Sequence, residues 1–268
     1  MTLETLKLET DADGVATLTL NRPEVLNSIN LQMVADLRTA VAEVAGDEAV
    51  RVLVITGAGR GFCAGADLKA KLEVGPGMTL GQAIGKSMEA AFNPLVRELS
   101  TLAKPVVAAV NGVAAGGGMS LALAADMVVA ARSARFIQVF GPQLGLVPDM
   151  GSTYFLSRLL GRARTRELTL LGEPLEAERA EDWGLIWKCV DDDDLMDEAL
   201  ALARRLAAGP LKCFELIKRA LDKAELSTLS EQLDLERDYQ QILADSEEFH
   251  EGLAAFAEKR RPEFKGRS

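Results

Sequence analysis

Two apolar runs in the sequence each lead directly into a turn rich in glycine. RVLVITG (51–57) is followed by GAGRGFCAGADL (57–68), and KPVVAAV (104–110) is followed by NGVAAGGG (111–118). Runs of this length without polar alternation are typical of strands that are buried on both faces, as in parallel sheets covered by helices. The two runs therefore predict an α/β fold whose central strands are mostly buried.

The residues around these runs supply the other elements of such a fold. We expect a hairpin over residues 6–21, helices over 31–45, 78–102 and from 119 to 125, and a strand over 127–131. Asp13-Gly14 is the turn of the hairpin, and Asn30 is a suitable N-cap for the first helix. Asn93-Pro94 should kink or break the second helix, because proline removes a backbone hydrogen bond.

The pattern changes after about residue 190, where no further strand is predicted. Apolar residues at helical spacing indicate three or four amphipathic helices from Leu195 onward. The run DDDD (191–194) fits a solvated turn and an acidic helix start. We therefore predict a core of residues 1–194 and a C-terminal helical region of residues 195–268.

Charge and composition exclude several classes of function. The net charge is −10, so nucleic acid is not an expected partner. His250 is the only histidine, which makes Ser-His-Asp, Cys-His and multi-histidine metal chemistry improbable. The three cysteines are odd in number and widely spaced, as in a reducing compartment. With neither a signal peptide nor a transmembrane run in sight, we expect a cytoplasmic protein without a membrane partner and without a metal.

The two glycine-rich turns are weak signals when each is taken alone. Their backbone N–H groups could approach a ligand, but a turn needed only for close packing would look similar. Together with NRPEVLNSIN (21–30) and AFAEKRRPEF (255–264), the two turns resemble the crotonase superfamily in order and spacing. The resemblance covers essentially the whole chain and implies a spiral of ββα units with a C-terminal helical region that forms trimers.

The resemblance also implies a site. The backbone N–H groups of Ala66 and Gly117 would form an oxyanion hole for the carbonyl oxygen of a coenzyme A thioester. Such donors stabilise the enolate that forms when a proton is removed beside the thioester. The implied substrate is an acyl-CoA, and no cofactor beyond the coenzyme A of the substrate is expected.

The acid–base group separates the reactions of this superfamily. Hydratases position water between two glutamates, and the matching positions here are Ser120 and Gly141, with a possible slip of one place at the second. Asp149 instead stands in LGLVPDMGST, in the neighbourhood where isomerases of the superfamily carry an acid. Local sequence leaves a second role open, because Asp149 could be the N-cap of the following helix. With both glutamates missing, the resemblance favours isomerisation with Asp149 as acid and base.

A narrower resemblance rests on LGLVPDMGS, LLGEPLEAERAEDWGLIWKCVDD and LSEQLDLERDYQ, which are similar to the 1,2-epoxyphenylacetyl-CoA isomerases of phenylacetate breakdown. These enzymes convert a ring epoxide into an oxepin thioester, and related ones shift an enoyl double bond. A hydratase, another reaction of the superfamily and a non-catalytic binding role remain alternatives.

The remaining implied contacts are with the substrate and with other subunits. Substrate-binding positions are Leu26, Ala64, Asp67, Leu68, Phe256 and Lys259. Asp67 could equally be a plain turn residue, and Lys259 an ordinary solvated lysine. The apolar stripes beyond Leu195 would be hard to cover against a single core, so we expect a homotrimer or a hexamer, with a monomer as the alternative.

Overall fold

Strands of the chain pair into two sheets. The structure is a computed structural model that describes residues 3–70 and 74–264. The larger sheet has the order β1 (Leu6–Thr10), β2 (Val15–Leu20), β3 (Val52–Gly57), β5 (Val106–Val110), β7 (Met127–Ala131) and β10 (Lys188–Val190). The smaller has the order β4 (Gly61–Cys63), β6 (Val113–Ala115), β8 (Arg135–Ile137) and β9 (Leu175–Glu176). The β1–β2 and β8–β9 pairs are antiparallel, and the others are parallel.

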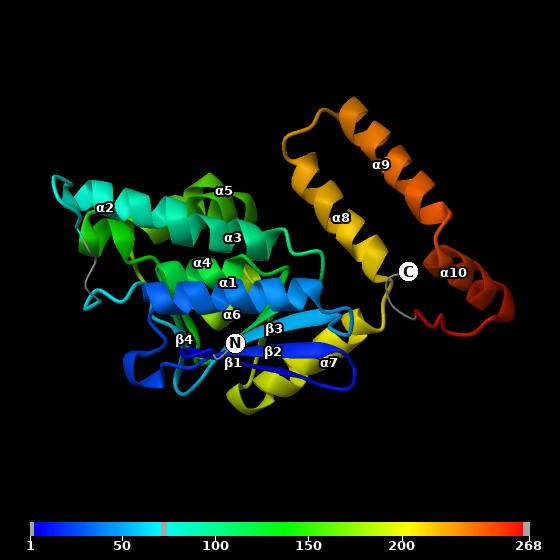
Figure 1. Ribbon diagram of the computed structural model, residues 1–268, viewed down its shortest axis with the longest axis horizontal. Coiled ribbons are helices and arrows are strands. Elements are labelled where there is room, and N and C mark those ends of the chain that lie inside the picture. Colours follow the sequence, from blue (N-terminus) through cyan, green and yellow to red (C-terminus); the bar gives the residue numbers. More distant parts are fainter. Residues whose placement is uncertain (1–2, 71–73, 265–268) are drawn as a thin grey trace.

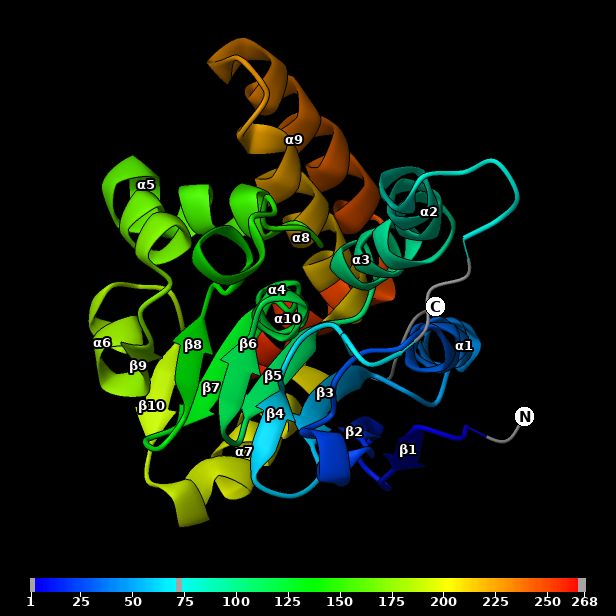
Figure 2. The same cartoon turned by 90° about the vertical axis from the view of Figure 1, so that its left-hand side faces the viewer.

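The two sheets are built by one repeated step of the chain. A strand of the larger sheet is followed directly by a strand of the smaller one in β3–β4, β5–β6 and β7–β8. A helical segment follows each of these pairs before the chain returns to the larger sheet. The predicted α/β class with a spiral of ββα units is therefore confirmed (Figure 2).

Ten α-helices are present in the described residues. They are α1 (Leu31–Gly46), α2 (Leu80–Ser87), α3 (Asn93–Ser100), α4 (Gly117–Leu123), α5 (Ser152–Leu171), α6 (Ala177–Asp182), α7 (Leu195–Ala207), α8 (Leu211–Ala224), α9 (Leu229–Ala244) and α10 (Glu247–Glu258). Asn30 is the N-cap of α1, as predicted, and its side chain accepts a hydrogen bond from the Met33 N–H. The helix predicted over 78–102 contains a π-helical turn, Met88–Phe92, just before Pro94. Proline thus changes the hydrogen-bonding pattern there without ending the helical path.

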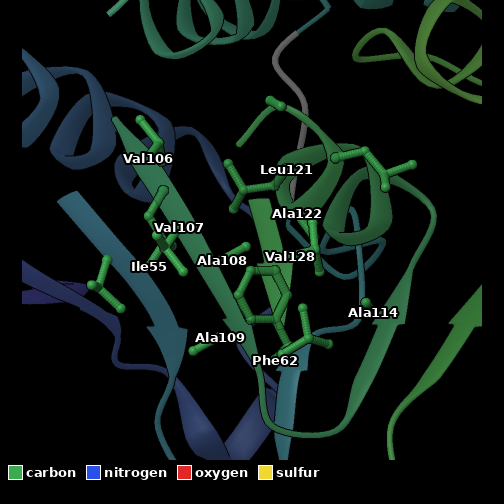
Figure 3. Packing of buried hydrophobic residues seen from close by; sticks show 14 of the residues in the cluster. Ile55, Phe62, Val106, Val107, Ala108, Ala109, Ala114, Leu121, Ala122 and Val128 are labelled. Carbon is green, nitrogen blue, oxygen red and sulfur yellow. The ribbon is translucent and has the colours of Figure 1, made fainter. Parts of the chain in front are cut away.

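The core lies between the larger sheet and the helices that cover it. The runs Val52–Ile55 and Val106–Val110 are buried along their whole length, as the absence of polar alternation predicts. Figure 3 shows Ile55 and Val106–Ala109 packed with Phe62 from β4 and with Leu121 and Ala122 from α4. Because Phe62 and Leu121 are almost fully buried, they fix the turns beside them against the larger sheet.

Helix α7 packs on the core, whereas the three helices after it extend away from the body. Leu195, Ala199 and Ala203 of α7 are buried in the main core cluster, and α7 contacts β3 and β5. Helices α8, α9 and α10, which we call the C-terminal arm, project to one side (Figure 1). The division predicted between residues 194 and 195 remains a prediction, although the packing groups α7 with the core.

The C-terminal arm carries many apolar side chains that its own chain does not cover. Large apolar side chains on the arm are exposed at Ile217, Leu221, Leu226, Leu229, Leu233, Ile242, Phe249, Leu253 and Phe256. Helix α9 contains no buried residue, although it is sixteen residues long. The amphipathic helices predicted from the sequence are therefore present, but much of their apolar surface is unpartnered within one chain.

A bilayer-spanning helix is not found among the residues that the structure describes, because none combines the necessary length with sufficient apolarity.

Candidate active site

The two glycine-rich turns lie side by side because the strands that precede them pair. Strands β4 and β6 are parallel, with Cys63 opposite Ala114, so both turns leave the same edge of the smaller sheet. Gly65, with φ of +89°, adopts a left-handed conformation that favours glycine. A Cβ at Gly65 would lie 2.7 Å from the Ala115 carbonyl oxygen and 3.4 Å from the Gly117 nitrogen. The close approach of the two turns therefore depends on the absence of a side chain at Gly65.

Two backbone N–H groups of these turns are available to a ligand. Ala66 forms an isolated bridge with Ile29, but the hydrogen bonds of that bridge use the carbonyl of Gly65 and the N–H of Asp67. Gly117 is the first residue of α4, where a backbone N–H has no partner within the helix. Neither the Ala66 nor the Gly117 N–H donates to an acceptor in the described part of the chain. The two donors predicted for the oxyanion hole thus lie on adjoining turns.

Cys63, which ends β4 beside the first turn, is not equipped to act as a nucleophile. Its side chain is fully buried, and burial raises the pKa of the thiol to about 12. A thiol that stays protonated at neutral pH is unreactive. Cys63 therefore fills space beneath the turn.

The positions that would carry glutamates in a hydratase lack acidic groups. Ser120, on α4, is fully buried. Gly141 lies in the π-helical turn Phe140–Leu144, where a Cβ would come within 2.7 Å of the Thr169 carbonyl oxygen. A π-helical turn holds more residues than an α-helical one, which explains why counting along the sequence can slip here. A Cβ on Gly116 would meet the side chains of Phe140 and Val139, so the wall next to the second turn is apolar.

Asp149 is not the N-cap of α5, which was the alternative to a catalytic role. The N-cap is Gly151, with φ of +85°, and it makes no side-chain capping bond. The Asp149 carboxylate is half-buried and has no hydrogen bond or ion pair with another residue that the structure describes. Burial raises its pKa to about 6, although the N–H of the same residue opposes that rise. Asp149 is therefore a free carboxylate with a pKa suited to a general base near neutral pH.

The segment around Asp149 lies against the second turn. A Cβ on Gly117 would lie 2.8 Å from the Met150 sulfur, and the Ser120 hydroxyl donates to the Asp149 carbonyl oxygen at 3.1 Å. Met150 is buried and has a positive φ of 49°, which is uncommon for a residue with a side chain. Such strain is often found at functional sites, where the surrounding structure holds it in place.

The implied substrate contacts of the first turn fall into two groups. Leu26 and Ala64 are joined by a hydrogen bond from the Ala64 N–H to the Leu26 carbonyl oxygen, 2.9 Å long, so both border the turn. Leu68 is 73% exposed and can contact a ligand. Asp67, by contrast, forms an ion pair with Arg22 at 3.0 Å, and its side chain is only 11% exposed. Burial alone would raise the pKa of Asp67, but hydrogen bonds from Arg22 and Lys69 hold it below its ordinary value. Asp67 thus braces the turn.

Phe256 and Lys259 do not reach the two turns within one chain. Both lie at the end of α10, and Phe256 is 87% exposed. In Figure 1, α10 lies at the far side of the C-terminal arm from β4 and α4, which carry the turns. The structure therefore brings Ala66, Gly117 and Asp149 into one region and leaves Phe256 and Lys259 elsewhere.

Several residues of the site were not predicted. The Asn27 side chain is fully buried and donates to the carbonyl oxygens of Ala58 and Gly61, which fixes the approach to the first turn. Its signal was present only as part of the NRPEVLNSIN motif. Gln138 and Ser152 hydrogen-bond beneath Asp149, but nothing in the local sequence marks them. Contacts between such distant positions become visible only in the fold.

Comparison with known proteins gives the same family throughout. The family described as "Enoyl-CoA hydratase/isomerase" matches residues 10–267. The 1,2-epoxyphenylacetyl-CoA isomerase of Escherichia coli (strain K12) is 52% identical over 256 residues, covering 95% of this chain and 96% of that protein. The trans-2-decenoyl-[acyl-carrier-protein] isomerase of Streptococcus mutans is 34% identical over 255 residues, covering 95% and 96%.

Solved structures agree with these relatives. The crystal structure of an enoyl-CoA hydratase from Bacillus anthracis matches with a TM-score of 0.90 at 31% identity, covering 98% of this chain and 100% of that one. Relatives named as an isomerase and as a hydratase each match nearly the full length of this chain, and the solved hydratase shares its fold. The chain belongs to the enoyl-CoA hydratase/isomerase family of the crotonase superfamily and is an enzyme of that family.

Proposed function

We propose that the enzyme isomerises an acyl-CoA thioester, with Ala66 and Gly117 as the oxyanion hole and Asp149 as the acid and base. The carboxylate removes a proton from the acyl group, and the negative charge moves to the thioester oxygen. Asp149 then returns the proton at another carbon, so the product has the composition of the substrate. This chemistry requires only proton transfer and charge stabilisation, and coenzyme A enters as part of the substrate.

The oxyanion hole is supported by the two unpartnered N–H groups on adjoining turns. Hydrogen-bond donors that are fixed before the reaction stabilise a developing oxyanion without reorganisation of the site. Each such donor contributes about a hundredfold to a thousandfold in rate. The Ala66 and Gly117 donors are held by β4, β6 and the start of α4, so they are rigid in this sense.

One observation carries the assignment of an isomerase. Asp149 is a half-buried, unpaired carboxylate with a pKa raised to about 6, and its neighbour Met150 touches the Gly117 turn. Ser120 and Gly141 provide no carboxylate where a hydratase would hold water. A single carboxylate can move a proton from one carbon to another, whereas the hydratases of the superfamily use two acids.

The proposed substrate class is an apolar or aromatic acyl-CoA. Leu146 and Val147, which precede Asp149 by a few residues, are 48% and 78% exposed and offer apolar surface. The E. coli relative is named for 1,2-epoxyphenylacetyl-CoA. We therefore propose conversion of 1,2-epoxyphenylacetyl-CoA to an oxepin thioester in phenylacetate breakdown, or a shift of an enoyl-CoA double bond.

We also propose that the enzyme is a homotrimer or a hexamer. The exposed apolar residues of the C-terminal arm would be covered by another copy of the chain. Such an assembly would also let Phe256 and Lys259 of one subunit reach the coenzyme A site of a neighbour. Light scattering should then give three or six times the chain mass of 28.7 kDa. A mass of one chain together with full activity would contradict the proposal.

A panel of acyl-CoA substrates in D2O tests the reaction type. Mass spectrometry of the products should show no addition of water, and deuterium should be incorporated to the extent that the protonated Asp149 exchanges with D2O before it returns the proton. Epoxyphenylacetyl-CoA and enoyl-CoA substrates in the panel separate the two proposed substrates. Products that have gained the mass of one water molecule would instead identify a hydratase.

A further inference from the structure

Three buried polar side chains form a continuous line that ends at Asp149. The Gln138 amide Nε2 donates to the Ser152 hydroxyl at 3.1 Å, and the hydroxyls of Ser152 and Ser120 lie 2.5 Å apart. The Ser120 hydroxyl is 3.1 Å from the main-chain carbonyl oxygen of Asp149. The relative exposure of Gln138, Ser152 and Ser120 is 0% in each case, so bulk water does not compete for these bonds.

The donor and acceptor chemistry of these groups favours one direction of hydrogen-bond donation along the line, from Gln138 towards Asp149. A carbonyl oxygen only accepts, so the Ser120 hydroxyl proton is committed to Asp149. A second carbonyl, that of Gly116, lies farther from the Ser120 hydroxyl, at 3.3 Å. When the Ser120 proton points to the Asp149 carbonyl, the Ser120 oxygen accepts from Ser152, whose oxygen in turn accepts from the Gln138 amide. Each bond polarises the next, so a directed line is stronger than the same bonds taken separately.

The line holds a main-chain position that is otherwise difficult to maintain. The Asp149 carbonyl oxygen also accepts the N–H of Ser152 at 3.0 Å, so two donors fix it, one from α4 and one from the start of α5. Met150 and Gly151 follow with φ values of 49° and 85°. Two successive left-handed residues form a tight turn, and a tether just before them keeps the strained path from relaxing.

A purely structural role does not explain the composition of the line. Apolar side chains would fill a fully buried site without requiring hydrogen-bond partners. The Gln138 oxygen, Oε1, has no partner among the described residues, and its amide nitrogen has only the Met119 sulfur as a second contact, at 3.3 Å. Such incomplete satisfaction is costly, and it is typical of polar groups that serve a functional site.

We propose that Gln138, Ser152 and Ser120 are positioning residues that hold the Asp149 carboxylate at the site through its main-chain carbonyl. This inference rests on the proposed role of Asp149 as acid and base. None of the three side chains needs to touch the substrate. Their effect is to keep Asp149 beside the Gly117 turn, where a displacement of about 1 Å can cost a hundredfold in rate.

Single substitutions along the line should have graded effects. Ser120→Ala removes the bond to Asp149 itself and should lower kcat about tenfold, less than loss of the carboxylate. Ser152→Ala leaves that bond but removes its support, and Gln138→Met removes only the first donor, so the losses should decrease in that order. KM should change little, because the thioester is bound by the Ala66 and Gly117 N–H groups.

The pH dependence of kcat/KM, which reports the pKa of the free enzyme, distinguishes positioning from general loss of stability. Burial raises the pKa of Asp149, so a carboxylate that is no longer held in place should become more hydrated and its pKa should fall. The acidic limb of the profile should therefore move to lower pH in Ser120→Ala and Ser152→Ala. A variant that is merely less stable would melt at a lower temperature and keep the acidic limb of the wild type.

Ser100→Ala provides a matched control. The Ser100 hydroxyl is also buried, but it has no hydrogen-bond partner among the described residues and lies outside the line. Its removal should leave kcat and the pH profile unchanged. If Ser152→Ala does not fold, Gln138→Met tests the same line, because it leaves both serine hydroxyls in place.

The results separate this inference from the proposed function. If Asp149→Asn keeps full activity, the role of Asp149 itself is wrong. If Asp149→Asn is inactive while Ser120→Ala, Ser152→Ala and Gln138→Met all keep wild-type kcat and the same acidic limb, only the positioning role is overturned. Graded losses of kcat together with a shifted limb are the result that we expect.

Discussion

The two halves of the site are built in different ways. The half that we propose as the oxyanion hole consists of backbone N–H groups on Ala66 and Gly117, held by the paired strands β4 and β6. The half that we propose for acid–base chemistry is a side chain, Asp149, carried on an irregular segment between a π-helical turn and α5. The first half is fixed by strand pairing and burial, whereas the second depends on a strained turn and a line of buried hydroxyls.

The difference indicates which half can change without loss of the fold. Substitution of exposed side chains on the irregular segment should leave the strands, the glycine-rich turns and the core intact. A relative named as an isomerase and one named as a hydratase each match nearly the full length of this chain. This agrees with a site whose backbone half is common to both and whose side-chain half varies. We therefore expect Asp149 and its neighbours to determine the type of reaction. We expect the two turns to activate the thioester.

Substitutions in the backbone half of the site should cause the largest loss of kcat/KM. A Cβ on Gly117 would press on the Met150 sulfur, at 2.8 Å, which is the end of a flexible side chain. Gly117→Ala should therefore fold and lose part of its activity, whereas Gly117→Val should also block the thioester and lose about two to three orders of magnitude in kcat/KM. Enzyme assays measure the loss of kcat/KM, and calorimetry measures whether free coenzyme A still binds. Unchanged turnover in Gly117→Val would show that the turn serves only packing.

The backbone half was also the more predictable one. Long apolar runs such as Val52–Ile55 and Val106–Val110 indicate buried strands on their own, and the turns follow from their glycines. Strands of two or three residues, such as β8 and β9, are too short to show a period, so they were not predicted. The role of α7 was also hidden, because an apolar stripe is the same whether it faces a sheet or another subunit.

The side-chain half was predictable only in part. Asp149 could be selected by resemblance, but its alternative role as an N-cap was decided only by the backbone at Gly151. The ion pair between Arg22 and Asp67 and the bond between Gln138 and Ser152 join residues that are distant in sequence. No local pattern records such contacts, because they are set by how the strands and helices pack.

The pH profile should sharpen the comparison, since only the side-chain half titrates near neutral pH. Asp149 must be ionised to accept a proton, and burial raises its pKa to about 6. Below that pH, kcat/KM should fall about tenfold per pH unit, and above it the rate should reach a plateau. Rate measurements from pH 4.5 to 8 test this. The protein should also be shown to stay folded over the same pH range. A plateau that extends down to pH 4.5 would contradict a role for Asp149 as base.

The smallest expected effect is on stability. The Asp149 pKa is higher in the folded chain than its ordinary value of 3.8, so the folded state binds the proton more tightly. Stability from this group therefore decreases as the pH rises from about 4 to 6, and the ionised carboxylate is unfavourable at pH 7. Asp149→Asn should raise the free energy of unfolding at pH 7 by about 1 kcal/mol, after allowance for partial exposure, and by less at pH 4.5. Denaturant titrations at both pH values measure the difference, and a destabilised variant at pH 7 would argue for a structural Asp149.

The most direct test of the account is the turnover of Asp149→Asn compared with Ser120→Ala on the acyl-CoA that the wild type isomerises. Asparagine retains the shape of aspartate but cannot accept the proton, so activity should fall by about two orders of magnitude or more while the fold and coenzyme A binding persist. Ser120→Ala should lose much less. Full activity in Asp149→Asn, or equal losses in the two variants, would contradict a site in which Asp149 moves the proton.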